Sequence, residues 1–436
     1  MQNLTNDLFR SDLIFNPTEP SILHIDLNSC FATIEQQANP FLRGRPIAIS
    51  AYNTPYSCIL APSIEAKTHG VKTGMRVSEG KKLCPDLHVM EPDSWKYRIA
   101  HLRLRRILDS YTSKVVPRSI DEFALDFSGT ASFRKGLMET AKDIKQRIQE
   151  DLGEWVRVSI GISTNFFLAK TAAGLHKPDG LDVINKENFL QVYKDLSLTD
   201  LCGIATNSAV RLNLSNIYSV LDFYGTSALG LKKAFGSILG YYWYLKLRGY
   251  EAEDYESKRK SFSHSYVVPK EVSSPEKIHP ILMKLIEKLC FRMKQNGYSS
   301  RGFGIALYYR NKLHWAKHKH LDRPIFLPMD VYRVLYKLLF SSPYAKESIK
   351  TIYVFAFDVD KVDTSQPDLF NNLNKEIELF NAIFDVNQKW GGFVLGSGLL
   401  LQAKGNVADR IAFGGVRDKI LENGGLDRAG ITGKVG

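Results

Sequence analysis

Short apolar runs alternate with helically spaced apolar residues through the first 176 residues. Runs such as "SILHIDLN" and "VRVSIGIS" predict buried strands, and the helical spacing ends at breakers such as Asn39-Pro40 and Gly153. The predicted strands are 21–28, 45–51, 114–129 and 156–163, and the predicted helices are 29–39, 63–75, 95–112, 134–153 and 165–176. This order predicts an α+β or mixed α/β body.

A second module follows a helical stretch and a linker. Residues 190–249 are predicted to be helical, and the charged segment 250–261 is typical of a linker. Beyond it, the runs "SFSHSYVV", "GFGIALYYR" and "SIKTIYVFAFDV" predict strands, and 274–297 and 329–342 predict helices. A polar tail is expected from residue 361.

Two acids stand side by side in the apolar stretch "RSIDEFALDF". Successive side chains of a strand point to opposite faces, so a buried face would hold an unpaired carboxylate, which is costly. Pro117 and Ser119 break the run just before Asp121 and Glu122, which predicts a hairpin tip there. Asp26 ends the first predicted strand and could converge with this pair.

Three converging carboxylates repel one another and need cations, and their oxygens suit Mg²⁺ or Mn²⁺. The sequence has no His and Cys set with zinc spacing. Two Mg²⁺ ions on shared carboxylates are typical of phosphoryl transfer, which predicts a metal-dependent nucleotidyl transferase or a nuclease. Unconnected surface acids remain the alternative.

The basic charge is concentrated in the second module. The chain has a net charge of +12, and residues 258–360 contain 19 Lys and Arg against 8 Asp and Glu. This favours a polyanionic partner, nucleic acid or an acidic membrane surface, over chance clustering on a solvated face. No apolar run reaches the ~18 residues of a membrane span, and no signal peptide is evident. Five scattered cysteines predict a reducing cytoplasm.

Three blocks resemble the Y-family DNA polymerases, the translesion enzymes of the DNA polymerase IV and V type. "HIDLNSCFATIEQQANPFLRGRPIAI" is similar to their opening motif, "SIDEFALDFSGT" to their second metal motif, and "VSIGISTNFFLAKTAAGLHKPDG" to their third block. The resemblance runs from about Ser21 to Asp360. It implies a multidomain α+β right-hand fold. It also implies a template-directed, low-fidelity DNA polymerase that extends primers past damaged bases in DNA repair, damage tolerance and the SOS response.

The resemblance divides the chain into six parts. These are an N-terminal extension (1–20), palm and fingers (21–186), a thumb (187–249), a linker (250–261), a DNA-binding little finger (262–360) and a C-terminal tail (361–436).

The resemblance also assigns roles at the catalytic site. Asp26, Asp121 and Glu122, with the carbonyl of Leu27, would hold two Mg²⁺ ions, with Mn²⁺ as the alternative metal. Phe31 would be the steric gate against ribonucleotides, whereas its spacing alone favours a core aromatic. The nucleotide-binding residues would be Ser29, Cys30, Phe31, Lys67 and Lys177.

The sequence departs from the polymerase IV pattern at several positions. Ile64 and Lys67 replace a Tyr and an Arg that grip the triphosphate, which resembles the polymerase V branch and predicts weaker nucleotide binding. Phe166 replaces an expected lysine. In "LCGIATNSAVRL", Gly203 belongs to a segment similar to a helix-hairpin-helix phosphate clamp, and Ala205 replaces its second glycine.

The implied partners are primer-template DNA, deoxynucleoside triphosphates, a sliding clamp and a polymerase V-type accessory subunit, with no membrane. The candidate DNA contacts are Gly203, Lys258, Arg259, Lys260, Arg301, Arg310 and Lys312. "HWAKHKHLD" (314–322) is interpreted as a basic DNA-facing segment rather than a metal site. The clamp-binding candidate is "QPDLF", with Gln366, Leu369 and Phe370, whose alternative is docking onto the body.

Two rival functions stay open from the sequence alone. One is a catalytically weak, DNA-binding accessory relative of the polymerases, and the other is a metal-dependent nuclease. The presence of all three carboxylates counts against the first, and the Phe31 position counts against the second.

Overall fold

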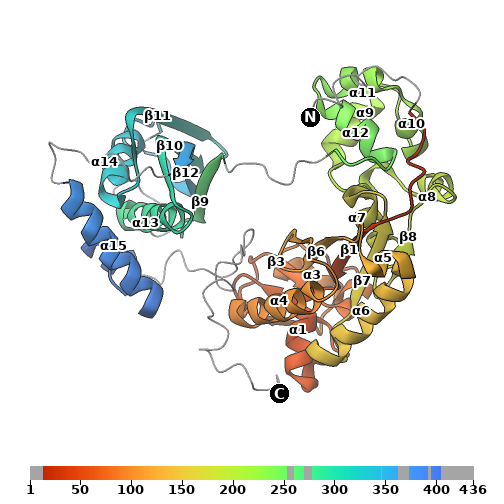
Figure 1. Cartoon of the computed structure of the whole chain (residues 1–436). Coiled ribbons are helices and arrows are strands. Elements are labelled where there is room, and N and C mark those ends of the chain that lie inside the picture. Colours follow the sequence, from red (N-terminus) through yellow and green to blue (C-terminus); the bar gives the residue numbers. More distant parts are fainter. Residues whose placement is uncertain are drawn as a thin grey trace. The chain divides into compact units, whose positions relative to one another are not determined.

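The computed structural model describes residues 13–252, 260–269, 277–344, 346–361, 373–390 and 394–403. They divide into two compact units, one on each side of residues 253–259 (Figure 1). Within these ranges, no helix is both long and apolar enough to cross a membrane. The predicted combination of helices and sheets in separate modules is confirmed.

A five-stranded sheet forms the centre of the first unit, in the order β5-β6-β1-β7-β8. Its strands are β1 (Ile22–Leu27), β5 (Val115–Pro117), β6 (Glu122–Asp126), β7 (Val158–Ser163) and β8 (Leu181–Val183). β1 lies between β6 and β7 and is antiparallel to both. Leu23 and Ile25 are fully buried, as the apolar run predicts for a central strand.

Helices cover both faces of this sheet. They are α1 (Cys30–Ala38), α4 (Ser94–Asp109), α5 (Ala131–Lys135), α6 (Leu137–Leu152) and α7 (Phe166–Leu175). α1, α4 and α6 share the main core with the sheet, whereas α7 lies against β1 and β7. Gly161 of β7 permits this approach, because a Cβ there would lie 2.0 Å from the carbonyl oxygen of Ala169.

A smaller sheet, in the order β3-β2-β4, stands beside the main one in the first unit. It consists of β2 (Ile47–Ser50), β3 (Ile59–Pro62) and β4 (His88–Met90), with helices α2 (Ile64–Thr68) and α3 (Val77–Leu83). A small separate core forms around Ile59 and Val71, whereas Ile47 and Ile49 of β2 belong to the main core.

A helical subdomain completes the first unit. It contains α8 (Phe189–Asp195), α9 (Thr206–Asn213), α10 (Val220–Gly225), α11 (Ala228–Phe235) and α12 (Leu239–Leu247). The segment before β1 joins its core, where Phe15 stacks on Phe189 with ring centroids 4.1 Å apart.

Buried Arg248 ties that segment to the helical subdomain. Its guanidinium lies 4.4 Å and 3.7 Å from the ring centroids of Tyr224 and Tyr244 and donates to the carbonyl oxygen of Leu13 at 2.8 Å. Asn16 N donates to the Arg248 carbonyl at 2.7 Å. Cation–π contacts and hydrogen bonds therefore compensate for the burial of this charge.

The second unit is a four-stranded antiparallel sheet with helices on one face (Figure 1). The strands are β9 (Ser261–Val267), β10 (Tyr298–Tyr309), β11 (His314–Ile325) and β12 (Ile349–Lys361), in the order β11-β10-β12-β9. α13 (His279–Gln295) and α14 (Pro328–Leu339) cover the apolar face, and the segment 314–322 belongs to an edge strand.

The predicted polar tail from residue 361 contains a helix and a short 3₁₀ segment within its described residues. α15 (Leu373–Trp390) and a 3₁₀ segment (Gly398–Ala403) belong to the second unit. Phe380 of α15 is 5% exposed and lies edge-on to Phe291 of α13. A narrow apolar stripe in a polar segment is enough for docking onto an existing core, and overall polarity conceals it.

Glu287 of α13 is a buried carboxylate at the contact with the segment after α15. Its Oε1 accepts a hydrogen bond from Ser397 N at 3.0 Å, and its Oε2 is buried with no hydrogen bond from the described residues. Burial raises the pKa of Glu287 to about 7, against the opposing effects of Ser397 and Lys284.

We expect the neutral variant Glu287→Gln to stabilise the second unit at higher pH. The pKa of Glu287 in the folded state lies above the ordinary value of 4.5, so the folded protein binds this proton more tightly than the unfolded chain does. The resulting contribution to the free energy of unfolding is fully present below about pH 4.5 and is lost as pH rises through about 7. The loss amounts to about 3 kcal/mol at most. Thermal unfolding of wild type and variant should agree near ~pH 4 and diverge towards ~pH 8.

The exposed Glu378 of α15 provides the control, because Glu378→Gln should show no such divergence. Parallel pH profiles for wild type and Glu287→Gln would contradict the argument.

Candidate active site

Two acids face each other on neighbouring strands of the main sheet. Asp26 of β1 is directly paired with Glu122 of β6 in the antiparallel register. The β5–β6 turn closes through hydrogen bonds from the amides of Arg118 and Ser119 to the Glu122 carbonyl, at 2.9 and 3.3 Å. The predicted hairpin tip before the acidic pair is therefore confirmed, and Asp121 is its last residue.

Lysine ammonium groups neutralise both acids. Lys177 Nζ donates to Asp26 Oδ2 at 2.6 Å, and Lys170 Nζ donates to both carboxylate oxygens of Glu122 at 2.8 and 2.6 Å. Lys177 was predicted at this site from the sequence, whereas Lys170 was not. The sequence feature that could have indicated Lys170 is its position as the single lysine in the apolar helix "FFLAKTAAGL".

Burial and charge act differently on the two carboxyls. Burial raises the pKa of Asp26 despite the adjacent Lys177. Burial also opposes ionisation of Glu122, but the hydrogen bonds and charge of Lys170 outweigh it and hold that pKa below its usual value. Burial lowers the pKa of nearby His24 to about 3, so this imidazole is neutral.

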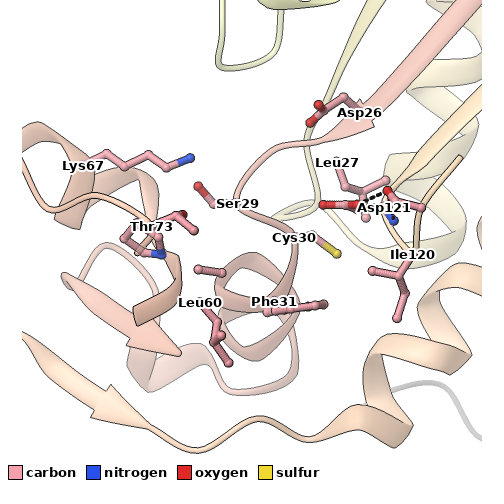
Figure 2. A pocket seen from close by; sticks show the side chains of 13 residues that line it. Asp26, Leu27, Ser29, Cys30, Phe31, Leu60, Lys67, Thr73, Ile120 and Asp121 are labelled. Atoms are coloured by element: carbon pink, nitrogen blue, oxygen red, sulfur yellow. Dashed lines mark hydrogen bonds between the residues drawn. The ribbon is translucent and has the colours of Figure 1, made fainter. Parts of the chain in front are cut away.

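A cavity of about 270 Å³ opens beside these acids. Asp26 and Asp121 line it, and Lys67 extends towards it from the opposite side, as Figure 2 shows. The lining residues are Asp26, Leu27, Ser29, Cys30, Phe31, Leu60, Ala61, Pro62, Lys67, Thr73, Ser119, Ile120 and Asp121. Most of the predicted nucleotide-binding residues therefore share one cavity, whereas Glu122 and Lys177 are not part of its wall.

Phe31 is at once a core residue and part of the cavity wall. Its side chain is 5% exposed and stacks on Tyr97 of α4, with centroids 4.3 Å apart and planes 17° apart. The Tyr97 hydroxyl donates to Glu35 at 3.1 Å, and Lys96 donates to the same carboxylate at 2.7 Å. The stack thus fixes one wall of the cavity, and Tyr97 was not predicted as part of the site.

The turn between β1 and α1 brings backbone close to the cavity. Ser29 has φ 50°, and its Oγ is buried without a hydrogen bond from the described residues. Leu27 N donates to the Asp121 carbonyl at 3.0 Å, which joins the turn to the β5–β6 hairpin. Burial raises the pKa of the Cys30 thiol well above its usual value, so it is not a nucleophile.

The residues that depart from the polymerase IV pattern lie on two helices, Ile64 and Lys67 on α2 and Phe166 on α7. Lys67 lies on α2, and burial together with the charge of Lys177 lowers its pKa. Ile64 begins α2 and is not part of the cavity wall. Phe166 begins α7, with the guanidinium of Arg118 5.2 Å from its ring centroid.

The candidate DNA contacts are spread over both units. Gly203 has φ 100° in an exposed turn before α9, and Ala205 is the N-cap of that helix. Lys260, Arg301, Arg310 and Lys312 are exposed in the second unit. The Arg310 side chain also donates to the Val268 carbonyl at 2.8 Å. Lys258, Arg259, Gln366, Leu369 and Phe370 lie outside the described residues.

The oxygen donors suit a divalent cation, although they are not gathered around one point. Within the described ranges, no three His, Cys, Asp or Glu side chains form a ligand group. Asp26 and Asp121 nevertheless share the cavity, with the buried Ser29 Oγ nearby. This donor set is of the hard type that Mg²⁺ or Mn²⁺ prefers.

Two family models match the chain: the impB/mucB/samB family over residues 25–174, and the C-terminal domain of that family over 259–369. A protein named DNA polymerase IV from Moorella thermoacetica is 30% identical over 392 residues, covering 88% of this chain and 97% of the relative. Another of that name, from Pelotomaculum thermopropionicum, is 28% identical over 375 residues, covering 85% and 92%.

Solved structures give the same fold. A chimera of the Y-family DNA polymerases Dbh and Dpo4 superposes with a TM-score of 0.67 at 23% identity, covering 78% of this chain and 99% of that chain. A ternary complex of Dbh superposes with a TM-score of 0.55 at 25% identity and the same coverage. The similarity thus extends over nearly the whole length of these relatives.

Lys170→Met should destabilise the first unit, because it leaves Glu122 opposite Asp26 without its cation. The Lys170 and Glu122 side chains are 35% and 18% exposed, so we expect a loss of about 1–2 kcal/mol, discounted for solvent screening. Denaturant unfolding of wild type and variant measures this difference in the free energy of unfolding.

Lys142→Met is the matched control, since its ion pair with Glu139 has a similar N–O distance, 2.7 Å, but is far more exposed. Equal effects of the two substitutions would show that the Glu122 pair contributes nothing beyond a surface contact.

Proposed function

The chain belongs to the impB/mucB/samB family, the Y-family of translesion DNA polymerases, and on this premise we propose which residues carry out DNA synthesis. It is a DNA-directed DNA polymerase of the translesion type, and the resemblance drawn from three sequence motifs is confirmed. The observation that carries the proposal is the cavity in which two aspartates face a lysine across space for a nucleotide.

The cavity residues suit a deoxynucleoside triphosphate and the end of a primer. The ammonium groups of Lys67 and Lys177 lie near the acids and would contact the triphosphate, with Ser29 and Cys30 beside it. Lys67 lacks the fork geometry of arginine, so its grip is that of a point charge. The Phe31 ring would stand against the sugar and exclude a 2′-hydroxyl.

Asp26, Asp121, Glu122 and the Leu27 carbonyl would hold two Mg²⁺ ions, for which Mn²⁺ is the alternative. When bound, these metals supply charge neutralisation for in-line nucleotidyl transfer. Asp26 is paired with Lys177 and Glu122 with Lys170, so both acids already attract positive charge. Lys177, which neutralises Asp26, is also the residue assigned to the triphosphate.

The two rival functions have weaker support. A non-catalytic DNA-binding relative would not need a cavity lined by Asp26, Asp121 and Lys67, with Glu122 paired to Asp26 on the next strand. A nuclease does not agree with relatives that are named DNA polymerase IV along nearly their whole length. Primer extension separates these functions, since it gives a longer strand, no change or a shorter strand.

The second unit would bind primer-template DNA through Lys260, Arg301, Arg310 and Lys312, together with Lys258 and Arg259. Gly203 would contact the DNA backbone from the helical subdomain. We further propose that Gln366, Leu369 and Phe370 bind the sliding clamp, which loaded-clamp stimulation of primer extension would test. We also propose that the protein works with a polymerase V-type accessory subunit. It would take part in the SOS response and be located in the cytoplasm.

Asp121→Asn combined with Glu122→Gln should lower the rate of nucleotide addition by on the order of a thousandfold or more, because charged ligands serve the transition state. DNA binding should stay nearly unchanged, since phosphate contacts elsewhere carry the affinity. Primer extension and a DNA-binding titration measure the two effects.

Asp126→Asn is the control for the double variant, because Asp126 is on the same strand and pairs with Lys114 outside the cavity. Extension by the double variant at close to the wild-type rate would refute the metal assignment.

Phe31→Ala should raise ribonucleotide insertion relative to deoxynucleotide insertion by on the order of 10–100-fold, because the ring volume is the repulsive element. Tyr97→Leu should give a smaller rise, since it removes the stacked support and leaves the Phe31 ring. Single-nucleotide insertion kinetics measure both.

Tyr97→Phe keeps the stacked ring and loses the hydroxyl contacts with Glu35 and the Asp93 amide, so it should retain the wild-type preference. If Phe31→Ala leaves sugar selection unchanged, the ring is a core residue and not the gate.

A further inference from the structure

Residues 176–180 form the loop that joins α7 to β8, and this loop carries Lys177. The Lys177 side chain extends from the loop to Asp26, and its charge also acts on Lys67, whose pKa is lowered by burial and by Lys177. A lysine side chain is a flexible four-carbon stem, so its ammonium group would occupy many positions if the loop itself moved. The position of this ammonium group therefore depends on what holds the loop.

Two buried side chains bind the backbone amides at the end of the loop. Asp179 N donates to Asn28 Oδ1 at 2.7 Å, and Gly180 N donates to Ser159 Oγ at 3.2 Å. Asn28 Nδ2 in turn donates to Ser159 Oγ at 3.0 Å. Asn28 is 4% exposed and Ser159 is fully buried, so both side chains would lose hydrogen bonds that water does not replace if the loop moved away.

A lysine of α6 binds the carbonyl groups of the same two loop residues. Lys145 Nζ donates to the Asp179 carbonyl at 2.5 Å and to the Gly180 carbonyl at 3.4 Å, and it lies 2.8 Å from Asp179 Oδ1. Asp179 has φ 62°, in the left-handed region that residues other than glycine seldom adopt. The contacts with Lys145 and Asn28 hold Asp179 in this conformation.

This network does more than attach β8 to the sheet. β8 is already paired with β7 through the backbone, where Ile160 lies opposite Leu181 and donates to the Gly180 carbonyl at 3.0 Å. Water can satisfy the backbone groups of a surface loop without any buried side chain. Here the β1–α1 turn, β7 and α6 each supply a polar side chain to the same two peptide units.

The network also joins the loop to the strand that carries an acid of the cavity. Asn28 follows Leu27, the last residue of β1, and Ser159 of β7 is paired with Asp26. A triphosphate that contacts Lys177 beside the acid-lined cavity needs a fixed distance between them. A binding group that is already in place loses less conformational freedom when the ligand arrives.

We propose that Lys145, Asn28 and Ser159 are positioning residues for nucleotide binding, which hold the backbone of residues 179–180 and so keep the Lys177 ammonium group at the cavity. The proposal rests on the assignment of Lys177 to the triphosphate under the proposed function. None of the three residues lines the cavity, so each acts through the loop and not by touching the nucleotide.

Lys145→Met should raise the KM for the incoming deoxynucleotide by on the order of tenfold and change kcat by less than about threefold, because it displaces a group that binds the substrate. Lys145→Arg keeps the charge and the donors and should restore the KM to within about twofold of wild type. Single-nucleotide insertion by the full chain measures both constants. Equilibrium binding of the nucleotide to the enzyme on a dideoxy-terminated primer measures the affinity without chemistry.

Lys142→Met is the matched control, because Lys142 lies on the same helix and its ion pair with Glu139, at 2.7 Å, does not involve the loop. It should leave both kinetic constants and the nucleotide affinity unchanged. An unchanged KM and affinity for Lys145→Met would overturn the proposal. A fall in kcat at unchanged KM would also overturn it, because the contact would then not serve nucleotide binding.

A double-mutant cycle separates positioning from a general loss of structure. If Lys145 acts through Lys177, Lys145→Met should change the KM by less than about twofold in a Lys177→Met background. Equal increases in both backgrounds would overturn the proposal. An unchanged KM for Lys177→Met alone would refute the assignment of that lysine to the triphosphate, and the positioning role with it. An effect of Lys177→Met without one of Lys145→Met would refute the positioning role only.

Asn28→Ala tests the loop from its other side and covers the case in which Lys145→Met fails to fold. It removes the acceptor of the Asp179 amide, so it should raise the KM and speed hydrogen exchange at Asp179 and Gly180 by on the order of tenfold. A raised KM with unchanged exchange of these two amides would overturn the proposal, because the loop would then have kept its position.

Discussion

The repulsion between two carboxylates on adjacent strands governs the organisation of the first unit. Asp26 and Glu122 face each other across the β1–β6 pair, and each requires a cation. Lys170 reaches Glu122 only because α7 lies directly on the sheet, which the bare backbone of Gly161 permits. The N-cap of α7, Asn165, also donates to the carbonyls of Lys246 and Tyr250. The same helix thus neutralises the site and attaches the helical subdomain.

Local features of the sequence predicted much of this fold. Continuous apolar runs identified the central strands, and the break at Pro117 and Ser119 located the hairpin tip that carries the acidic pair. The ion pair between Lys170 and Glu122 could not be predicted in this way, because the two residues are 48 positions apart and no periodicity links them. The stack of Phe31 on Tyr97 has the same origin in tertiary packing. The docking of α15 was hidden by its polar composition.

The apolar run "SIKTIYVFAFDV" predicted a strand, which the structure confirms as β12. It did not reveal which side α13 and α14 cover, because that depends on how helices distant in sequence pack. The side chains that a single strand carries can therefore be predicted from the sequence. Which face of the sheet is exposed depends on the packing of the whole unit. The roles of Gln366, Leu369 and Phe370 remain predictions, since they lie outside the described residues.

As the proposed gate, Phe31 would couple sugar selection to stability, because its ring belongs to both the cavity wall and the core. A smaller side chain enlarges the cavity and also removes packing from Tyr97 and its neighbours. A larger one would narrow the cavity and strain the same stack. Under the proposed gate role, the tolerance of the core would limit variation in sugar selection at this position, and substitution of Tyr97 would change the wall with a smaller direct effect on the substrate.

The contact between Arg248 and the segment before β1 imposes an order on biosynthesis. Leu13 emerges from the ribosome early, yet its partner Arg248 is 235 residues further along the chain. Contacts of such long sequence separation form late and slow the completion of folding. The central sheet can assemble while synthesis continues, but the apolar side chain of Phe15 stays uncovered until the helical subdomain is made. A nascent chain therefore exposes this hydrophobic segment to chaperones until the helical subdomain has been made.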